Sequence, residues 1–136
     1  MIRTGGFTHV HLVVHDIERS AAFYREALGA EEMFRLGPGT RFMRLPDRNE
    51  VIALRLADEP ARIDHFGLAF DSGDMDEAIA QLEAAGGHLV ERGERRQGMP
   101  FAYVADPDGH VLELEPSPAV LMSAGQHREQ RPASKA

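Results

Sequence analysis

The stretch Tyr103-Val-Ala-Asp-Pro-Asp-Gly-His-Val-Leu-Glu113 carries the clearest structural signal in the chain. Its centre, Asp106 to Gly109, has tight-turn composition, because proline presets φ, aspartate bonds nearby backbone and glycine accepts positive φ. Apolar residues on both sides predict a hairpin that joins a strand over 101–105 to a strand over 110–115. Because side chains alternate along a strand, Glu113 faces away from Leu112 and Leu114. Glu113 therefore lies either on a solvated face or in a functional site.

The pattern that ends in this hairpin occurs twice. Strands are expected over 7–14, 31–36, 40–45 and 51–56, then over 63–70, 88–92, 101–105 and 110–115. Asp16 and Gly29 bound a helix in the first copy, and Asp74 (or Ser72) and Gly86 bound one in the second. His9 precedes Gly29 by 20 residues and His65 precedes Gly86 by 21, so the spacing repeats.

The repeat predicts an α+β fold of tandem βαβββ modules, forming a mixed-sheet cup with the helices on the outside. Module one covers about 7–56 and module two about 63–115, within a single domain over 1–116. Residues 117–136 lose apolar periodicity and are expected to form a polar, mobile tail.

Composition restricts the classes of function. The chain has 136 residues, 43% of them hydrophobic and 27% charged, which is typical of a globular protein. A net charge of −7 gives no general attraction to nucleic acid or to an anionic membrane. No segment resembles a signal peptide or a transmembrane span, so we expect a cytoplasmic protein. Without cysteine, any metal must be held by His, Asp, Glu or water.

Three residues form a candidate metal site. His9 and His65 occupy equivalent places in the first strands of the two modules, each facing away from its module's helix. Glu113 has the corresponding orientation on the last strand. If the modules pair about a pseudo-two-fold axis, two imidazoles and one carboxylate line one concave sheet. That set matches the 2-His-1-carboxylate site for a divalent transition metal.

The run from His9 to Gly29, which includes His15-Asp16-Ile17 and Ala22-Phe23-Tyr24, resembles the opening signature of the vicinal oxygen chelate superfamily. Asp106 to Glu113 is similar to its closing signature. This superfamily includes glyoxalase I, extradiol dioxygenases, fosfomycin-resistance enzymes and bleomycin-binding proteins. The resemblance covers about residues 7–116 and implies His9, His65 and Glu113 as the metal ligands. It also matches Tyr103 to a tyrosine that extradiol and fosfomycin enzymes share, which implies a catalytic role.

Departures from the family pattern separate the reaction classes. Glyoxalase I-like members carry a fourth, carboxylate ligand where this chain has Ala53, which cannot bind a metal. Fosfomycin thiol transferases have a threonine where His11 stands. Within this chain, His11 is substrate-facing, a partner of the ligands or solvated. Arg55 either contacts an anionic substrate or lies at a solvated strand end.

The sequence therefore predicts a metal-dependent enzyme on a small oxygenated metabolite, most like an extradiol-type ring-cleavage dioxygenase. Fe(II) is the metal expected first, with Mn, Ni, Co or Zn as alternatives. A glyoxalase- or thiol-transferase-like reaction is a second hypothesis, and a drug-binding self-resistance protein is a third. We also expect a homodimer, with modules paired within one chain or exchanged between two.

Overall fold

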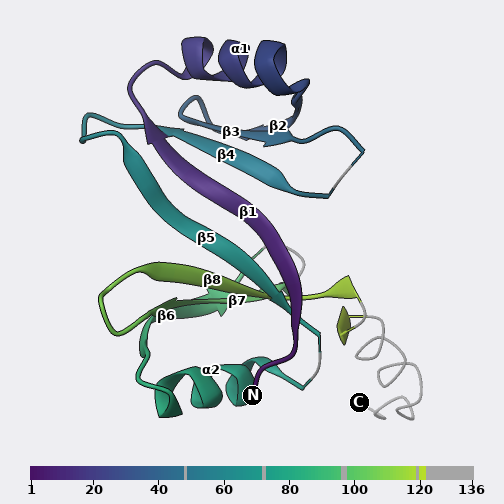
Figure 1. Ribbon diagram of the computed structural model, residues 1–136, viewed down its shortest axis with the longest axis vertical. Coiled ribbons are helices and arrows are strands. Elements are labelled where there is room, and N and C mark those ends of the chain that lie inside the picture. The colour runs from purple at the N-terminus through teal and green to yellow at the C-terminus, as the bar shows by residue number, and fades with distance from the viewer. Residues whose placement is uncertain (48, 72, 96–97, 119, 122–136) are drawn as a thin grey trace, which may run out of the picture. The chain divides into compact units, whose positions relative to one another are not determined.

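The computed structural model describes residues 1–121 except 48, 72, 96–97 and 119 (Figure 1). Most of the predicted tail therefore lies outside the described residues. The elements follow the order β1 (Thr4–Val14), α1 (Ile17–Leu28), β2 (Glu31–Leu36), β3 (Thr40–Arg44), β4 (Val51–Leu56), β5 (Arg62–Phe70), α2 (Met75–Ala84), β6 (His88–Glu94), β7 (Pro100–Ala105) and β8 (Val111–Pro116). The predicted α+β fold of two βαβββ copies is confirmed.

The eight strands hydrogen-bond in the order β2-β3-β4-β1-β5-β8-β7-β6. In each copy the last strand returns beside the first, since β4 neighbours β1 and β8 neighbours β5. The β1–β4 pair is parallel, whereas β2–β3 and β3–β4 are antiparallel. The matching pairs β6–β7 and β7–β8 are also antiparallel. The sheet is therefore mixed, as the repeat predicts.

The described residues divide into two compact units, one over residues 7–67 and one over residues 1–6 together with those from 68 to 121. In the first unit, α1 begins at Asp16, whose carboxylate accepts from the Arg19 amide, and ends at Gly29 in the left-handed region. The apolar stripe of α1 packs on β3 and β4; the buried residues of this core are Val14, Ile17, Ala21, Ala30, Met43 and Leu54. Arg41 is buried on β3 and donates to the carboxylate of Glu18 on α1.

In the second unit, α2 begins at Asp74, which accepts from the Glu77 amide, so Asp74 is the cap. The helix ends at Ala84, two residues before the predicted Gly86. The core of this unit consists of Phe70, Met75, Ala78, Ile79, Ala102, Val104 and Leu114. Among the described residues, no helix has the length and apolar character needed to cross a membrane.

Candidate metal centre

His9 lies on β1 with its ring fixed by a neighbour in sequence. The Thr8 hydroxyl lies 3.0 Å from His9 Nδ1, which leaves Nε2 as the ring atom directed toward β5. Gly67 on β5 makes this position possible. A Cβ at residue 67 would overlap the His9 ring and the Thr8 hydroxyl, so a side chain there cannot coexist with the observed ring position. The sequence Thr8-His9 and the glycine opposite it together determine where the first imidazole points.

His65 lies on β5 and is held by an ionised neighbour. Its Nδ1 is 2.8 Å from a carboxylate oxygen of Asp64, and the His65 side chain is only 4% exposed. Asp64 also accepts from Arg62 at 2.8 Å and from Arg55 at 3.4 Å. Partial burial alone would raise the pKa of Asp64, but hydrogen bonds from His65 and Arg62 outweigh it and lower the pKa to about 2. The His65 ring is therefore hydrogen-bonded to a carboxylate that stays negatively charged at neutral pH.

The two imidazoles meet through their Nε2 atoms. His9 Nε2 lies 3.1 Å from His65 Nε2, and the rings stand nearly perpendicular, with centroids 5.1 Å apart. Two histidine nitrogens bound at about 2.1 Å to one metal, at right angles, are about 3 Å apart. The pair therefore has the spacing of neighbouring ligands in a six-coordinate site.

His11 lies on the same face of β1 as His9. Its ring centroid is 4.6 Å from that of His65, and its Nε2 is buried without a hydrogen-bond partner among the described residues. Burial, with a contribution from His65, lowers the pKa of His11 from 6.5 to about 4, so the ring is neutral at pH 7. His11 is thus half-buried, contacts a predicted ligand and keeps a buried nitrogen without a hydrogen-bond partner among the described residues.

A row of residues leads from His11 to the sheet edge. His11 pairs with Ala53, Ala53 with Phe42, and Phe42 with Phe34, so all four share one face. The Phe34 and Phe42 rings are stacked with centroids 4.3 Å apart, and Phe34 is 48% exposed. Ala53 is fully buried on the face of His9 and His11, as its predicted register requires.

Glu113 lies on β8 opposite Tyr103 on β7, so the two side chains share a face. Glu113 is 2% exposed, and one of its oxygens accepts from Arg95. Arg95 also donates to the Tyr103 hydroxyl at 3.1 Å and lies 4.3 Å above the Phe101 ring. Burial, together with the charge of Glu113, raises the pKa of Tyr103. The phenol is therefore protonated at neutral pH.

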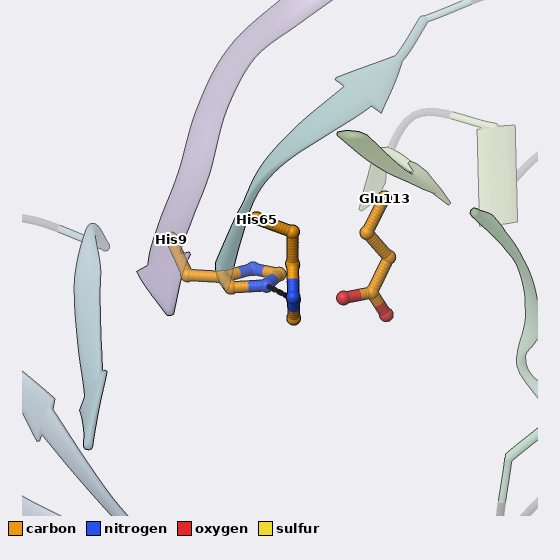
Figure 2. A group of neighbouring side chains, drawn as sticks. All are labelled: His9, His65 and Glu113. Carbon is orange, nitrogen blue, oxygen red and sulfur yellow. Dashed lines mark hydrogen bonds between the residues drawn. The ribbon is translucent and has the colours of Figure 1, made fainter. Parts of the chain in front are cut away.

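His9, His65 and Glu113, the three residues predicted as ligands, each offer one atom that could bind a metal. One ligand atom each from His9, His65 and Glu113 lies within 4.8 Å of the others (Figure 2). Two imidazole nitrogens and a carboxylate oxygen are suitable donors for Fe, Mn, Co, Ni or Zn. A carboxylate accepts at both oxygens, so the contact of Glu113 with Arg95 leaves acceptor capacity for a metal.

Several residues around these three were not predicted from sequence. Asp64 orients His65, Thr8 contacts His9, Gly67 admits the His9 ring, and Arg95 reaches Glu113. Arg55, predicted to meet an anionic substrate or solvent, contacts Asp64 and Glu59. An aspartate directly before a strand histidine, and a basic loop before the last hairpin, are the signals that point to Asp64 and Arg95.

Comparison with known proteins finds similarity over most of the chain, including all three candidate ligands. The family model described as the Glyoxalase/Bleomycin resistance protein/Dioxygenase superfamily matches residues 6–114. The fosfomycin resistance protein FosX of Listeria monocytogenes is 26% identical over 117 residues, which are 80% of this chain and 87% of FosX.

Two solved structures are similar at somewhat higher identity. The Mn(II)-bound glyoxalase from Novosphingobium aromaticivorans is 29% identical with a TM-score of 0.73, over 88% of this chain and 40% of that one. The 2,3-dioxygenase LapB from Pseudomonas sp. KL28 is 27% identical with a TM-score of 0.72, over 86% of this chain and 42% of that one. This chain thus spans less than half the length of both.

Proposed function

Because the chain belongs to the Glyoxalase/Bleomycin resistance protein/Dioxygenase superfamily, we propose that it is a metal-dependent enzyme acting on a small oxygenated metabolite. The observation that carries this proposal is the convergence of one donor atom each from His9, His65 and Glu113 within 4.8 Å. The 3.1 Å separation of the two Nε2 atoms supports it, because that is the spacing of adjacent ligands on one metal.

His9, His65 and Glu113 are the proposed ligands, and Fe(II) is the proposed metal, with Mn, Ni, Co or Zn as alternatives. A divalent metal held there supplies Lewis acidity toward substrate oxygens and, when it is iron, redox chemistry with dioxygen. Three protein ligands leave about three positions of an octahedral metal for substrate and a further reactant. A substrate with two adjacent oxygens suits that arrangement.

Tyr103 and His11 are the proposed catalytic or substrate-facing groups. The raised pKa of Tyr103 keeps its hydroxyl protonated, so it serves as a hydrogen-bond donor or general acid rather than as a phenolate base. The lowered pKa of His11 keeps its ring neutral, and its buried Nε2 can accept from or donate to a substrate oxygen.

Ring cleavage of a catechol is the specific reaction we propose first. It agrees with the similarity to the 2,3-dioxygenase LapB. It also agrees with the stacked Phe34–Phe42 pair, which gives the His11 face an apolar, aromatic extension beyond the polar groups. Aromatic substrates gain favourable stacking or edge-to-face contacts on such surfaces.

A reaction on an anionic substrate such as fosfomycin is the second candidate. Here the similarity to FosX extends over 87% of that protein, whereas LapB is matched over 42% of its length. Arg95 supplies a cation beside Glu113 and Tyr103 that suits a phosphonate or carboxylate. A glyoxalase-type isomerisation has less support because Ala53 stands where a fourth, carboxylate ligand is expected, and we predict no such activity.

The first experiment measures metal binding by metal analysis of the purified protein and by calorimetric titration with Fe(II) and Mn(II). We expect about one metal per chain in the wild type and its loss in His65→Ala and Glu113→Gln, since a three-ligand site cannot spare a ligand. His88→Ala is the control, because His88 is an exposed histidine on β6. A wild type without metal affinity, or equal losses in the control, contradicts the proposal.

The second experiment separates the reactions. Oxygen uptake with substituted catechols supports ring cleavage, whereas loss of fosfomycin without oxygen uptake supports the second candidate. A protein that binds fosfomycin or bleomycin tightly and converts no substrate contradicts an enzymatic role. Metal removal by a chelator is expected to abolish either activity, and re-addition of metal to restore it.

A further inference from the structure

Asp64 gives His65 Nδ1 a charged hydrogen-bond partner, whereas the partner of His9 Nδ1 is neutral. Its carboxylate lies 2.8 Å from His65 Nδ1, whereas the corresponding contact of His9 Nδ1 is to the neutral hydroxyl of Thr8 at 3.0 Å. Hydrogen bonds with an ionised partner are roughly twice as strong as neutral ones. The two proposed ligands therefore differ in how firmly each ring is held.

The chemistry of the partner determines which nitrogen of His65 carries the proton. An ionised carboxylate can only accept a hydrogen bond, so His65 Nδ1 must be the protonated nitrogen. The lone pair then lies on Nε2, the atom 3.1 Å from His9 Nε2. For these two atoms to share a hydrogen bond, His9 must donate from Nε2, and its Nδ1 must accept from Thr8.

The two rings then respond differently to a metal. A metal on His9 Nε2 requires its proton to move to Nδ1, and the Thr8 hydroxyl can turn from donor to acceptor to receive it. His65 needs no such change, because its Nε2 lone pair is already in place. His65 is prepared for a metal before one arrives.

We propose that Asp64 is a positioning residue that fixes the Nδ1-protonated form and the orientation of His65, and so makes it the stronger of the two histidine donors. This inference rests on the proposed metal site. A carboxylate behind a ligating histidine raises the basicity of the ring and holds it in place. Arg62 and Arg55 add to this by donating to the Asp64 carboxylate, which holds it in position beside His65.

Glu59 provides a matched control. Its carboxylate accepts from the same two arginines as Asp64, at 3.3 Å from Arg62 and 3.5 Å from Arg55. Glu59→Gln therefore removes one negative charge from the same arginine cluster without touching the imidazole. Any effect that the two variants share reflects the cluster, and the difference between them reflects the contact with His65.

Calorimetric titration of the metal-free protein with Mn(II) tests the proposal. We expect Asp64→Asn to weaken Mn(II) binding by about 10- to 100-fold, the usual effect of losing such a partner, and Glu59→Gln to change it less than about 3-fold. If the wild type binds no Mn(II) or Fe(II), the proposed metal site fails and this inference fails with it. If the wild type binds and Asp64→Asn binds equally well, or both variants weaken alike, only the role of Asp64 is overturned.

A measurement without metal decides the same point independently of affinity. Long-range ¹H–¹⁵N NMR of the metal-free wild type at neutral pH should show His65 protonated at Nδ1. In Asp64→Asn the amide can donate as well as accept, so a mixture of both neutral forms is expected. A wild-type His65 protonated at Nε2 overturns the proposal, even if the variant does not fold.

Discussion

Gly67 shows how a residue without a side chain can control a candidate metal site. Its backbone passes so close to the His9 ring and the Thr8 hydroxyl that no Cβ fits between them. The φ angle of Gly67 is not in the positive region, so the requirement is for space alone. Adding even one methyl group at residue 67 therefore disturbs His9, a proposed metal ligand.

We predict that Gly67→Ala displaces the His9 ring and weakens Mn(II) binding on the order of tenfold, because metal sites tolerate little movement of a ligand. Calorimetric titration measures the affinity, and a thermal melt without metal measures stability. Gly39→Ala is the control, since a Cβ at residue 39 meets nothing within 4 Å. Unchanged affinity in Gly67→Ala would show that His9 does not need its observed position.

Sequence patterns identified the residues on the inner face better than the residues that support them. Alternation along a strand assigns His9, His65 and Glu113 to a face, which is the information that the prediction used. The same alternation assigns Asp64 to the opposite face, yet its side chain bends back to His65 Nδ1. Arg95 lies beyond the end of β6 and reaches Glu113 through a long flexible side chain. Contacts of these kinds depend on rotamers, which periodicity does not determine.

The hairpin of β7 and β8 agrees closely with the prediction made from its turn residues. Its strands fall within one residue of the predicted ranges, and Gly109 has the positive φ of 93° that its place in the turn suggests. The strand β8 begins at Val111 rather than at residue 110, because the His110 amide donates to the Asp106 carboxylate. Asp106 also accepts from the Asp108 amide and lies 2.9 Å from His110 Nδ1. One carboxylate thus organises the whole turn.

This turn predicts a pH dependence of stability. The Asp106 carboxylate raises the pKa of His110 above 6.5, and His110 lowers the pKa of Asp106 below 3.8. The histidine contribution is complete below pH 6.5 and is lost as the pH rises through the folded-state pKa of His110. The aspartate contribution is present above pH 3.8 and is lost as the pH falls through the folded-state pKa of Asp106.

We therefore expect the melting temperature of the wild type to exceed that of His110→Gln most between about pH 4 and pH 6.5, and the difference to shrink above that range. Thermal melts of both proteins across pH 3 to 9 measure it. His88→Gln is compared in parallel to remove the effect of a distant exposed histidine. A difference that is flat with pH, or equal in the control, contradicts an ion pair in the turn.

The part of the chain that the structure describes contains two hydrophobic cores. Leu12 and Val14 of β1 pack with α1, whereas Leu68 and Phe70 of β5 pack with α2. The boundaries between the compact units accordingly fall inside β1 and β5, after Gly6 and Gly67, and not in the stretch 57–62 between the two sequence repeats. Sequence periodicity reveals that the unit repeats. It does not reveal which end of a long strand joins which core.

The oligomeric state remains a prediction, and β2 supplies the argument for a homodimer. This strand ends the strand order, so one of its edges is unpaired within the described chain. Met33, Phe34 and Leu36 are each about half exposed on it. Unpaired edges with exposed apolar side chains favour association with another chain. We expect light scattering at micromolar concentration to give twice the chain mass.

A charge on this edge tests where the two chains meet. We expect Leu36→Lys to shift the protein toward the monomer, because a lysine on an edge strand must lose its hydration when a second chain covers it. Ile63→Lys is the matched control, since Ile63 is also exposed but lies on β5, an inner strand of the order. A monomeric wild type contradicts the homodimer. A dimeric wild type that Leu36→Lys leaves intact instead excludes the β2 edge and directs attention to β6, the strand at the opposite end of the order, where Val90 is 59% exposed.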